Sequence, residues 1–191
     1  MVQQAQFLVK LLFILLIAAC SDQTEVMQIV NAGSVDLKTK SGVSTVNNKP
    51  FTGILFSLDQ NNDTIQIAQY RNGKEDGCWK QFYEKNSLQE IRYFVDGKKT
   101  DSLVEWWPNG IKKSFIEFEE DEYNGVCKEW NHQGQLIKEM YYEKGYEKGS
   151  QKVWYDDGKI KSNYYAVNGR RYGLLGSKNC VNVSDSALAD R

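Results

Sequence analysis

Hydrophobic and polar residues alternate in short runs along most of the chain, and each run ends at a turn-forming residue. The stretch GSQKVWYDDGKIKSNYYAVNGRRYG, residues 149–173, contains two such runs, one before Asp-Asp-Gly and one before Asn-Gly. An alternation with a period of two predicts a strand, and Asp-Gly or Asn-Gly between two such runs predicts a hairpin turn. This stretch therefore predicts two strands, each followed by a tight turn.

The same pattern recurs every 24 residues. Turn-forming residues occupy three columns with this spacing: Gly53, Gly77, Asp101, Gly125, Gly149 and Gly173; Gly73, Gly97, Asp121, Gly145 and Gly169; and Asn62, Asn86, Gly110, Gly134 and Gly158. Gly and Asn adopt positive φ at low cost, so each column marks a place where the chain turns. Segments of about seven residues leave no room for crossover helices. We therefore predict an all-β fold, an elongated single-layer antiparallel meander of β-hairpin repeats.

The repeat also predicts dimensions and one exception. Two strands per unit give roughly 10 Å of sheet, so five units span about 50 Å. Cys78 and Cys127 lie two units apart, and a separation of about 20 Å is too large for a disulfide. The third unit departs most from the pattern, because Asp101 and Asp121 replace Gly and acidic residues crowd positions 117–122. We expect its turns to be irregular.

Alternation assigns the aromatic residues of the units to two faces. Counted from the first Gly of a unit, even positions are expected on the more buried face: Phe94, Trp106, Ile116, Trp130, Leu136, Met140, Tyr142, Trp154 and Ile160. Odd positions are expected on the second face, where an exposed aromatic ladder forms the candidate binding surface: Tyr83, Tyr93, Trp107, Tyr141, Tyr155 and Tyr165. Tyr and Trp offer large contact area at low entropic cost. Alternatively, a one-layer sheet needs aromatic residues on both faces simply to exclude water.

Composition narrows the function classes. The chain has 191 residues, 41% hydrophobic and 26% charged, which is typical of a globular protein. Its formal net charge of −1 gives no electrostatic case for nucleic-acid binding. No Walker loop, GxGxxG, HExxH or GxSxG motif occurs, and the only His is His132. The glycines are spaced as turns and no helix follows them to bind a phosphate. We expect no catalytic residues, no metal site and no cofactor.

The N-terminal residues predict a membrane anchor. In MVQQAQFLVKLLFILLIAAC, residues 1–20, a short segment with one cation, Lys10, precedes an apolar run that is too short to span a bilayer. The run ends in Ile-Ala-Ala-Cys, which resembles the bacterial lipobox, and the resemblance implies cleavage before Cys20 and acylation of Cys20. Ser21 is similar to the residue found in signals sorted to the outer membrane. An ordinary secretory signal with a chance Cys, or an uncleaved anchor, is the alternative.

The units resemble MORN repeats, and more closely the bacterial MORN-variant repeats of YwqK-type proteins. The matching residues are Gly77, Trp79, Phe82, Tyr83, Glu90, Tyr93, Gly97 and Lys98, and then Gly125, Trp130, Gly134, Leu136, Tyr141 and Gly145. The resemblance implies an interaction module rather than an enzyme. It also raises the alternative that the protein is an antitoxin. A lipobox argues against this alternative, because an exported protein could not neutralise a toxin in the cytoplasm.

Together these observations predict four segments and one function. The segments are a lipoprotein signal peptide (1–19), a tether with a possible degenerate first repeat (20–46), the repeat array (47–173) and a C-terminal cap and tail (174–191). We expect a protein held in the bacterial cell envelope, at the outer membrane, through lipidated Cys20. Its sheet would bind an unknown protein or envelope glycan. A carbohydrate- or peptidoglycan-binding module is the third hypothesis.

Overall fold

The computed structural model describes residues 27–84 and 87–176, and the regular structure in this range is almost entirely β-strand. One short 3-10 helix, Ala32–Ser34, follows the first strand. The strands are β1 (Gln28–Asn31), β2 (Leu37–Lys40), β3 (Val43–Val46), β4 (Lys49–Pro50), β5 (Gly53–Leu58), β6 (Thr64–Arg71), β7 (Lys74–Phe82), β8 (Leu88–Val95), β9 (Lys98–Trp106), β10 (Lys112–Glu119), β11 (Glu122–Trp130), β12 (Leu136–Glu143), β13 (Tyr146–Trp154), β14 (Ile160–Val167) and β15 (Arg170–Leu174).

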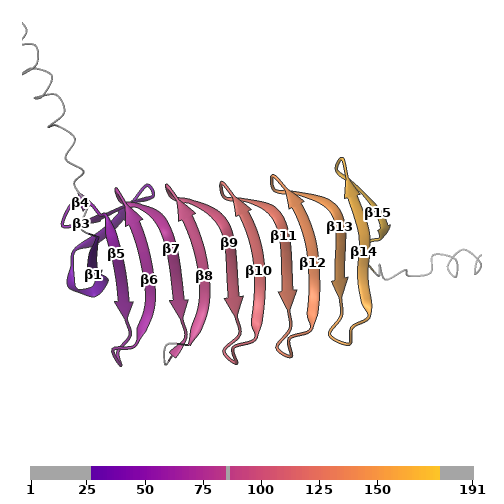
Figure 1. Ribbon diagram of the computed structural model, residues 1–191, viewed down its shortest axis with the longest axis horizontal. Coiled ribbons are helices and arrows are strands. Elements are labelled where there is room, and N and C mark those ends of the chain that lie inside the picture. Colours follow the sequence, from indigo (N-terminus) through magenta and orange to yellow (C-terminus); the bar gives the residue numbers. More distant parts are fainter. Residues whose placement is uncertain (1–26, 85–86, 177–191) are drawn as a thin grey trace, which may run out of the picture.

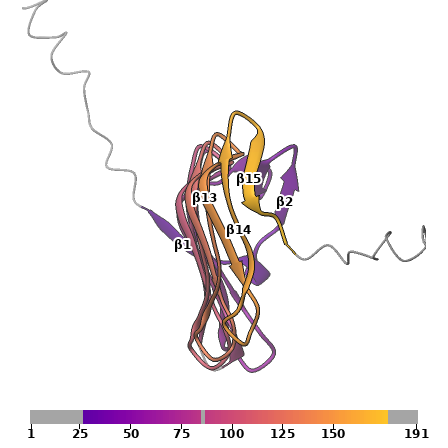
Figure 2. The same cartoon turned by 90° about the vertical axis from the view of Figure 1, so that its right-hand side faces the viewer.

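Twelve strands form one open sheet. From β5 to β15 each strand pairs with the next strand of the chain, and all of these pairings are antiparallel. The strands therefore stand side by side in an extended row (Figure 1), and the row is a single curved layer when it is seen from its end (Figure 2). This arrangement confirms the predicted all-β meander of successive hairpins.

Residues 28–50 do not continue the meander. Strand β1 pairs with β5 in parallel, while β2, β3 and β4 form a separate three-stranded sheet. Neither pairing continues the antiparallel hairpins of the repeat array. The small sheet packs against the first turn between units, where the Ser44 N–H donates to the Gly73 carbonyl oxygen at 2.6 Å. A side chain at Gly73 would meet Val43. Glycine is thus required here for close approach.

In the four units whose turn is described throughout, the hairpin turn inside the unit is a three-residue loop. In the third unit, the Trp107 N–H donates to the Ile111 carbonyl and the Gly110 N–H donates to the Trp107 carbonyl, each at 2.8 Å. Gly110 has a φ of +80°. A type I turn followed by one residue with positive φ is a common way to close a hairpin of this length.

The turns between units are two-residue loops in which both residues have positive φ. Asp96 and Gly97 have φ of +51° and +84°, as a type I′ turn requires. Glu120 and Asp121 adopt the same conformation, with φ of +49° and +72°. The irregularity expected in the third unit is therefore absent at this turn, since Asp tolerates the left-handed region well enough to stand in for Gly. Asp101, which also replaces a Gly, has a φ of +57°.

A β-bulge in the second strand of each unit reverses the alternation of side chains. In the second unit, Gln81 pairs with Glu90 and Phe82 pairs with Leu88, so Gln89 has no partner in the ladder. The same shift recurs in the other four hairpins. Because one extra residue moves every later side chain to the other face, a single parity cannot describe both strands of a unit. The expected assignment of the two faces was therefore wrong for the residues before each bulge and right for those after it.

The pairing defines two faces. We name the core face by its buried hydrophobic side chains: Leu55, Ala68, Phe94, Cys127, Met140, Tyr164 and Ala166. We name the opposite face the tyrosine face by its two aromatic columns: Trp106, Trp130 and Trp154, and Tyr93, Tyr141 and Tyr165. Ile116, Met140, Phe94 and Tyr142 lie on the core face as expected, whereas the three Trp residues, Leu136 and Ile160 lie on the tyrosine face.

Cross-strand ring contacts join the units on the core face. Tyr70 packs on Trp79 and Trp79 packs on Phe94, with ring centroids 5.8 and 5.3 Å apart. Such pairs each add about 0.5–1.5 kcal/mol beyond the area they bury. The contacts link residues of adjacent strands, so the stability of this repeat array comes largely from nearest neighbours.

The two described thiols should differ sharply in reactivity. Cys78 and Cys127 are both free, and Cys127 is buried on the core face. Burial raises the pKa of the Cys127 thiol to about 11. Since only the thiolate reacts, about one molecule in a thousand is reactive at pH 8. We expect iodoacetamide at pH 8 to modify Cys78 well before Cys127, as measured by peptide mass spectrometry. Equal rates in the folded protein would contradict the burial, and denatured protein provides the control.

Candidate functional site

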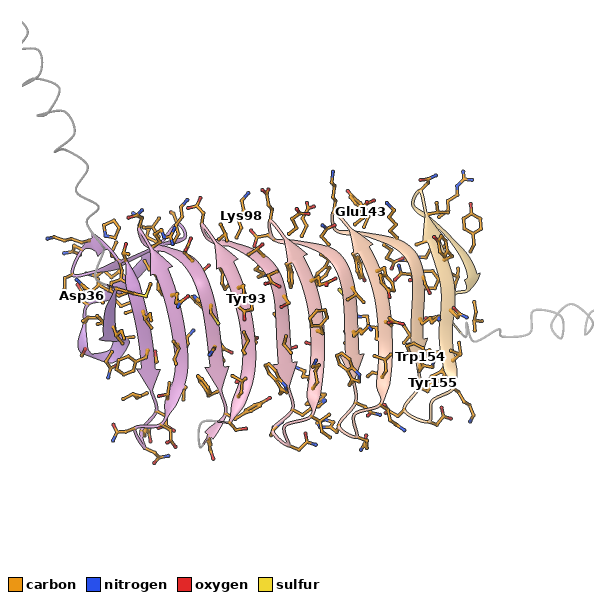
Figure 3. All side chains as sticks on the ribbon, viewed as in Figure 1. Asp36, Tyr93, Lys98, Glu143, Trp154 and Tyr155 are labelled. Atoms are coloured by element: carbon orange, nitrogen blue, oxygen red, sulfur yellow. The ribbon has the colours of Figure 1, made fainter. Side chains whose placement is uncertain are left out.

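The structure separates the six aromatic residues of the predicted ladder into two groups. Tyr93, Tyr141 and Tyr165 form one column on the tyrosine face, with cross-strand partners Cys78, Val126 and Ser150. The other three, Tyr83, Trp107 and Tyr155, directly follow the first strands of their units and begin the hairpin loops, as Tyr155 shows next to Trp154 at the lower end of β13 (Figure 3). The six side chains therefore do not form one surface.

The loop aromatic residues brace adjacent units. The Tyr83 hydroxyl donates to the carbonyl oxygen of Trp106 at 3.0 Å, and the Trp107 indole N–H donates to that of Trp130 at 3.1 Å. The Trp107 ring also stacks on His132, with centroids 3.7 Å apart. In both cases the side chain reaches the backbone of the next unit, so its role is structural. Lys161 lies over the ring of Tyr155, with Nζ 5.6 Å from the centroid.

The tyrosine column carries the more accessible rings. Tyr141 and Tyr165 are 41% and 57% exposed, whereas Tyr93 is half-buried. The pKa of Tyr93 is raised, chiefly by its cross-strand partner Cys78. The exposed pair lies on β12 and β14, with β13 between them, and two strand spacings place the two Cα atoms about 10 Å apart. This pair is where the described part of the chain presents adjacent members of the column to solvent.

An open hollow of about 620 Å³ includes both exposed tyrosines in its lining. Gly149 and Ser150 also line the hollow, from the strand β13 that separates the two tyrosine strands, and Ser150 is the cross-strand partner of Tyr165. Asn124, Gly125, Tyr142, Glu143 and Lys148 complete the lining. Lys148 and Glu143 form an ion pair at the rim, and this pairing lowers the pKa of Glu143. The hollow thus combines ring surfaces with hydroxyl, amide and charged groups.

The hollow is open because of the residue at position 141. The register of β12 with β13 equals that of β6 with β7 and of β10 with β11, so Tyr141 corresponds to Gln69 and Glu117. In those units the side chain folds over the neighbouring glycine, and an added Cβ at Gly77 or Gly125 would lie 2.0 Å from Gln69 Oε1 or Glu117 Oε2. An added Cβ at Gly149 would meet nothing within 4 Å.

Gln151 supports the hollow from the core face. Its side chain is fully buried and holds Tyr141 through the backbone, with Nε2 donating to the Tyr141 carbonyl at 2.8 Å and Oε1 accepting from the Tyr141 N–H at 3.3 Å. Nε2 also donates to the Lys148 carbonyl at 3.1 Å. These bonds hold the backbone of Tyr141 and of Lys148, the two residues that supply a ring and a cation to the hollow.

Sequence reasoning identified Tyr141 and Tyr165 but missed Ser150, Lys148 and Gln151. The sequence did contain one signal for the hollow. Equivalent positions of successive units hold Gln69, Tyr93, Glu117, Tyr141 and Tyr165, and two successive units have tyrosine there only at the end of the array. The bulge hid its meaning, since strict alternation assigns the Trp and Tyr columns to different faces, whereas the bulge brings them onto the same face. Cys20 and the signal peptide lie outside the described residues.

The described residues contain neither a metal-binding cluster nor a helix that could cross a membrane. None of their His, Cys, Asp and Glu side chains gather in a group of three or more that could hold a metal ion. No helix in the same ranges is long and apolar enough to cross a membrane. Within the acidic run, Glu117 has a structural role, because its Oε2 accepts from the Val126 N–H at 2.5 Å.

Comparisons with known proteins do not identify a family. No protein-family model matches the chain, and no curated protein matches it. Among solved structures, a mutant of TarM from S. aureus matches with a TM-score of 0.32 and 14% sequence identity. The match covers 51% of this chain and 20% of TarM, so the chain spans a small part of that protein. A similarity of this size supports no conclusion about fold or function.

Proposed function

We propose that this protein is a lipid-anchored envelope protein whose repeat sheet binds a protein or an envelope component through its tyrosine face, without catalysis. The observation that carries the proposal is the open hollow between Tyr141 and Tyr165, the pair of exposed rings that the sheet holds at a fixed spacing. Rigid aromatic groups on a preformed surface lose little entropy on binding. The Ile-Ala-Ala-Cys sequence that ends at Cys20 supports the membrane anchor.

The anchor is tested at Cys20. We expect the full-length protein, produced in a bacterium with a lipoprotein pathway, to incorporate labelled palmitate and to remain with membranes after a high-salt wash. Cys20→Ala should remove the label completely. Mass spectrometry of the N-terminal peptide should find acylated Cys20 as the first residue. An unmodified, uncleaved N-terminus in the wild-type protein would contradict the lipoprotein part of the proposal.

The binding face is tested by capture. Crosslinking of the full-length protein in intact cells, followed by purification, should recover a partner that is lost in Tyr93→Ser/Tyr141→Ser/Tyr165→Ser. The matched control is Tyr155→Ser, because Tyr155 is 42% exposed, like Tyr141, but belongs to a hairpin loop. Equal recovery with a correctly folded triple variant would show that the tyrosine face is not the binding surface.

A further inference from the structure

The pairing between units has a register shift of its own, and at two of these boundaries, β6–β7 and β10–β11, a side-chain oxygen fills the space beside it. Gln69 Oε1 accepts from the Cys78 N–H at 2.7 Å, and Glu117 Oε2 accepts from the Val126 N–H at 2.5 Å. Cys78 and Val126 lie at equivalent positions, 48 residues apart, and neither has a partner in the ladder with the preceding strand. A carboxamide or a carboxylate is thus the chemistry that this backbone position binds.

Between β12 and β13, at the boundary of the fourth and fifth units, the equivalent position lies inside the hollow. Ser150 is equivalent to Val126, 24 residues further on, and it is likewise outside the ladder between β12 and β13. The residue that would supply the acceptor is Tyr141, whose ring carries no oxygen at the distance where Gln and Glu carry theirs. The space over Gly149 is open instead. An acceptor oxygen from a bound molecule would fit where the carboxamide of Gln69 lies in its own unit.

The walls of the hollow restrict what that molecule can be. Contacts of about 3.5–4 Å on both sides of a flat group need rings about 7–8 Å apart, and Cα atoms about 10 Å apart allow this with a small tilt of each side chain. The rim carries the Ser150 hydroxyl, the Glu143–Lys148 ion pair and the Asn124 amide, which is itself bonded to Glu119 and to the Lys144 N–H. A pyranose ring has apolar C–H faces for the tyrosines and hydroxyl groups for such a rim.

We propose that the hollow binds an acetamido sugar, with the sugar ring between Tyr141 and Tyr165 and the acetamido oxygen accepting a hydrogen bond from the Ser150 N–H. The inference rests on the proposed function, because it names the envelope component that the tyrosine face binds. A Gln or Glu side chain of a partner protein could supply the same oxygen. Its narrow stem would leave most of both ring surfaces uncovered, so the observations favour the sugar.

The test uses two probes that differ by the acetamido group. The full-length protein in detergent is titrated with the β-1,4-linked tetramer of N-acetylglucosamine and with the β-1,4-linked tetramer of glucose, and binding is followed by saturation-transfer NMR and calorimetry. We expect one site that binds the acetylated tetramer at least tenfold more tightly than the glucose tetramer. A third probe, a capped Gly-Ser-Gln-Ser-Gly peptide, tests the side-chain alternative.

Variants of the hollow make the test specific. Tyr141→Gln should abolish binding, because the new carboxamide is expected to fold over Gly149 as Gln69 folds over Gly77. Tyr165→Ala, which removes one wall, should weaken binding at least tenfold. The matched control is Tyr146→Ala, since Tyr146 is 80% exposed on the same strand as Ser150 but does not line the hollow. This variant should bind like the wild-type protein.

The outcomes separate this inference from the proposed function. Equal binding of both tetramers, binding of the peptide but neither tetramer, or full binding by Tyr141→Gln would each overturn the acetamido site. Any of these could occur in a protein that is acylated at Cys20 and captures its partner through the tyrosine face, and the proposed function would then stand. Loss of acylation and capture with intact tetramer binding would overturn the function and leave the site.

Discussion

Gln151→Leu is expected to lower the free energy of unfolding by about 3 kcal/mol. The substitution nearly conserves volume, but it leaves the Tyr141 N–H, the Tyr141 carbonyl and the Lys148 carbonyl without the partner that Gln151 provides. The site is fully buried, so water cannot replace these bonds without opening the sheet. An unsatisfied buried polar group costs about 1–3 kcal/mol, and three groups that share one side chain are not additive.

Urea denaturation followed by Trp fluorescence measures the loss, and amide hydrogen exchange locates it. Repeat arrays can unfold in parts, so we expect the amides of β12 and β13 to lose more protection than those of β6 and β7. Gln133→Leu is the matched control, because Gln133 is exposed in a hairpin loop and should change stability by less than about 0.5 kcal/mol. A loss below about 1 kcal/mol for Gln151→Leu would show that the buried bonds are dispensable.

The sequence was sufficient for the architecture because the turns have strong local signals. A Gly or Asn in every turn column, at a constant spacing, specifies where each strand ends, and the short segments between turns permit only neighbour pairing. Asp101 and Asp121 fit the same columns, since both adopt the positive φ that the glycines provide elsewhere. The prediction of irregular turns gave too much weight to residue identity and too little to the tolerance of Asp for this conformation.

The two faces of the sheet and the candidate site could not be predicted from the sequence in the same way. The unpaired bulge residue differs from unit to unit, as Gln89 and Lys113 illustrate, so no residue type marks it. The bulge nevertheless decides which aromatic residues share a face. The braces formed by Tyr83 and Trp107 join residues 23 apart, across the boundary between two units. A reading of each unit by itself assigns such rings to a surface, although their polar atoms already have partners.

The parallel strand β1 should depend on a single glycine. Gly53 has a φ of +146°, and a Cβ added there would lie 2.3 Å from the backbone oxygen of Gln28 and 2.9 Å from the ring of Phe51. Gln28 is the β1 residue that pairs with Gly53. A side chain on Gly53 must therefore push β1 away, and Gly53→Ala is expected to lower the free energy of unfolding by about 3–4 kcal/mol from backbone strain and overpacking together.

Gly149→Ala is the matched control, because Gly149 occupies the same position of its unit. Its φ is +75° and a Cβ would have free space, so only the left-handed backbone should cost stability, about 1–2 kcal/mol. A difference of less than about 1 kcal/mol between the two variants would mean that β1 does not need its close approach to Gly53. If β1 does detach, the outer backbone groups of β5 become an unpaired sheet edge, which favours association between copies. Gly53→Ala should therefore also form oligomers in analytical ultracentrifugation, whereas Gly149→Ala, which leaves β1 in place, should sediment like the wild-type protein.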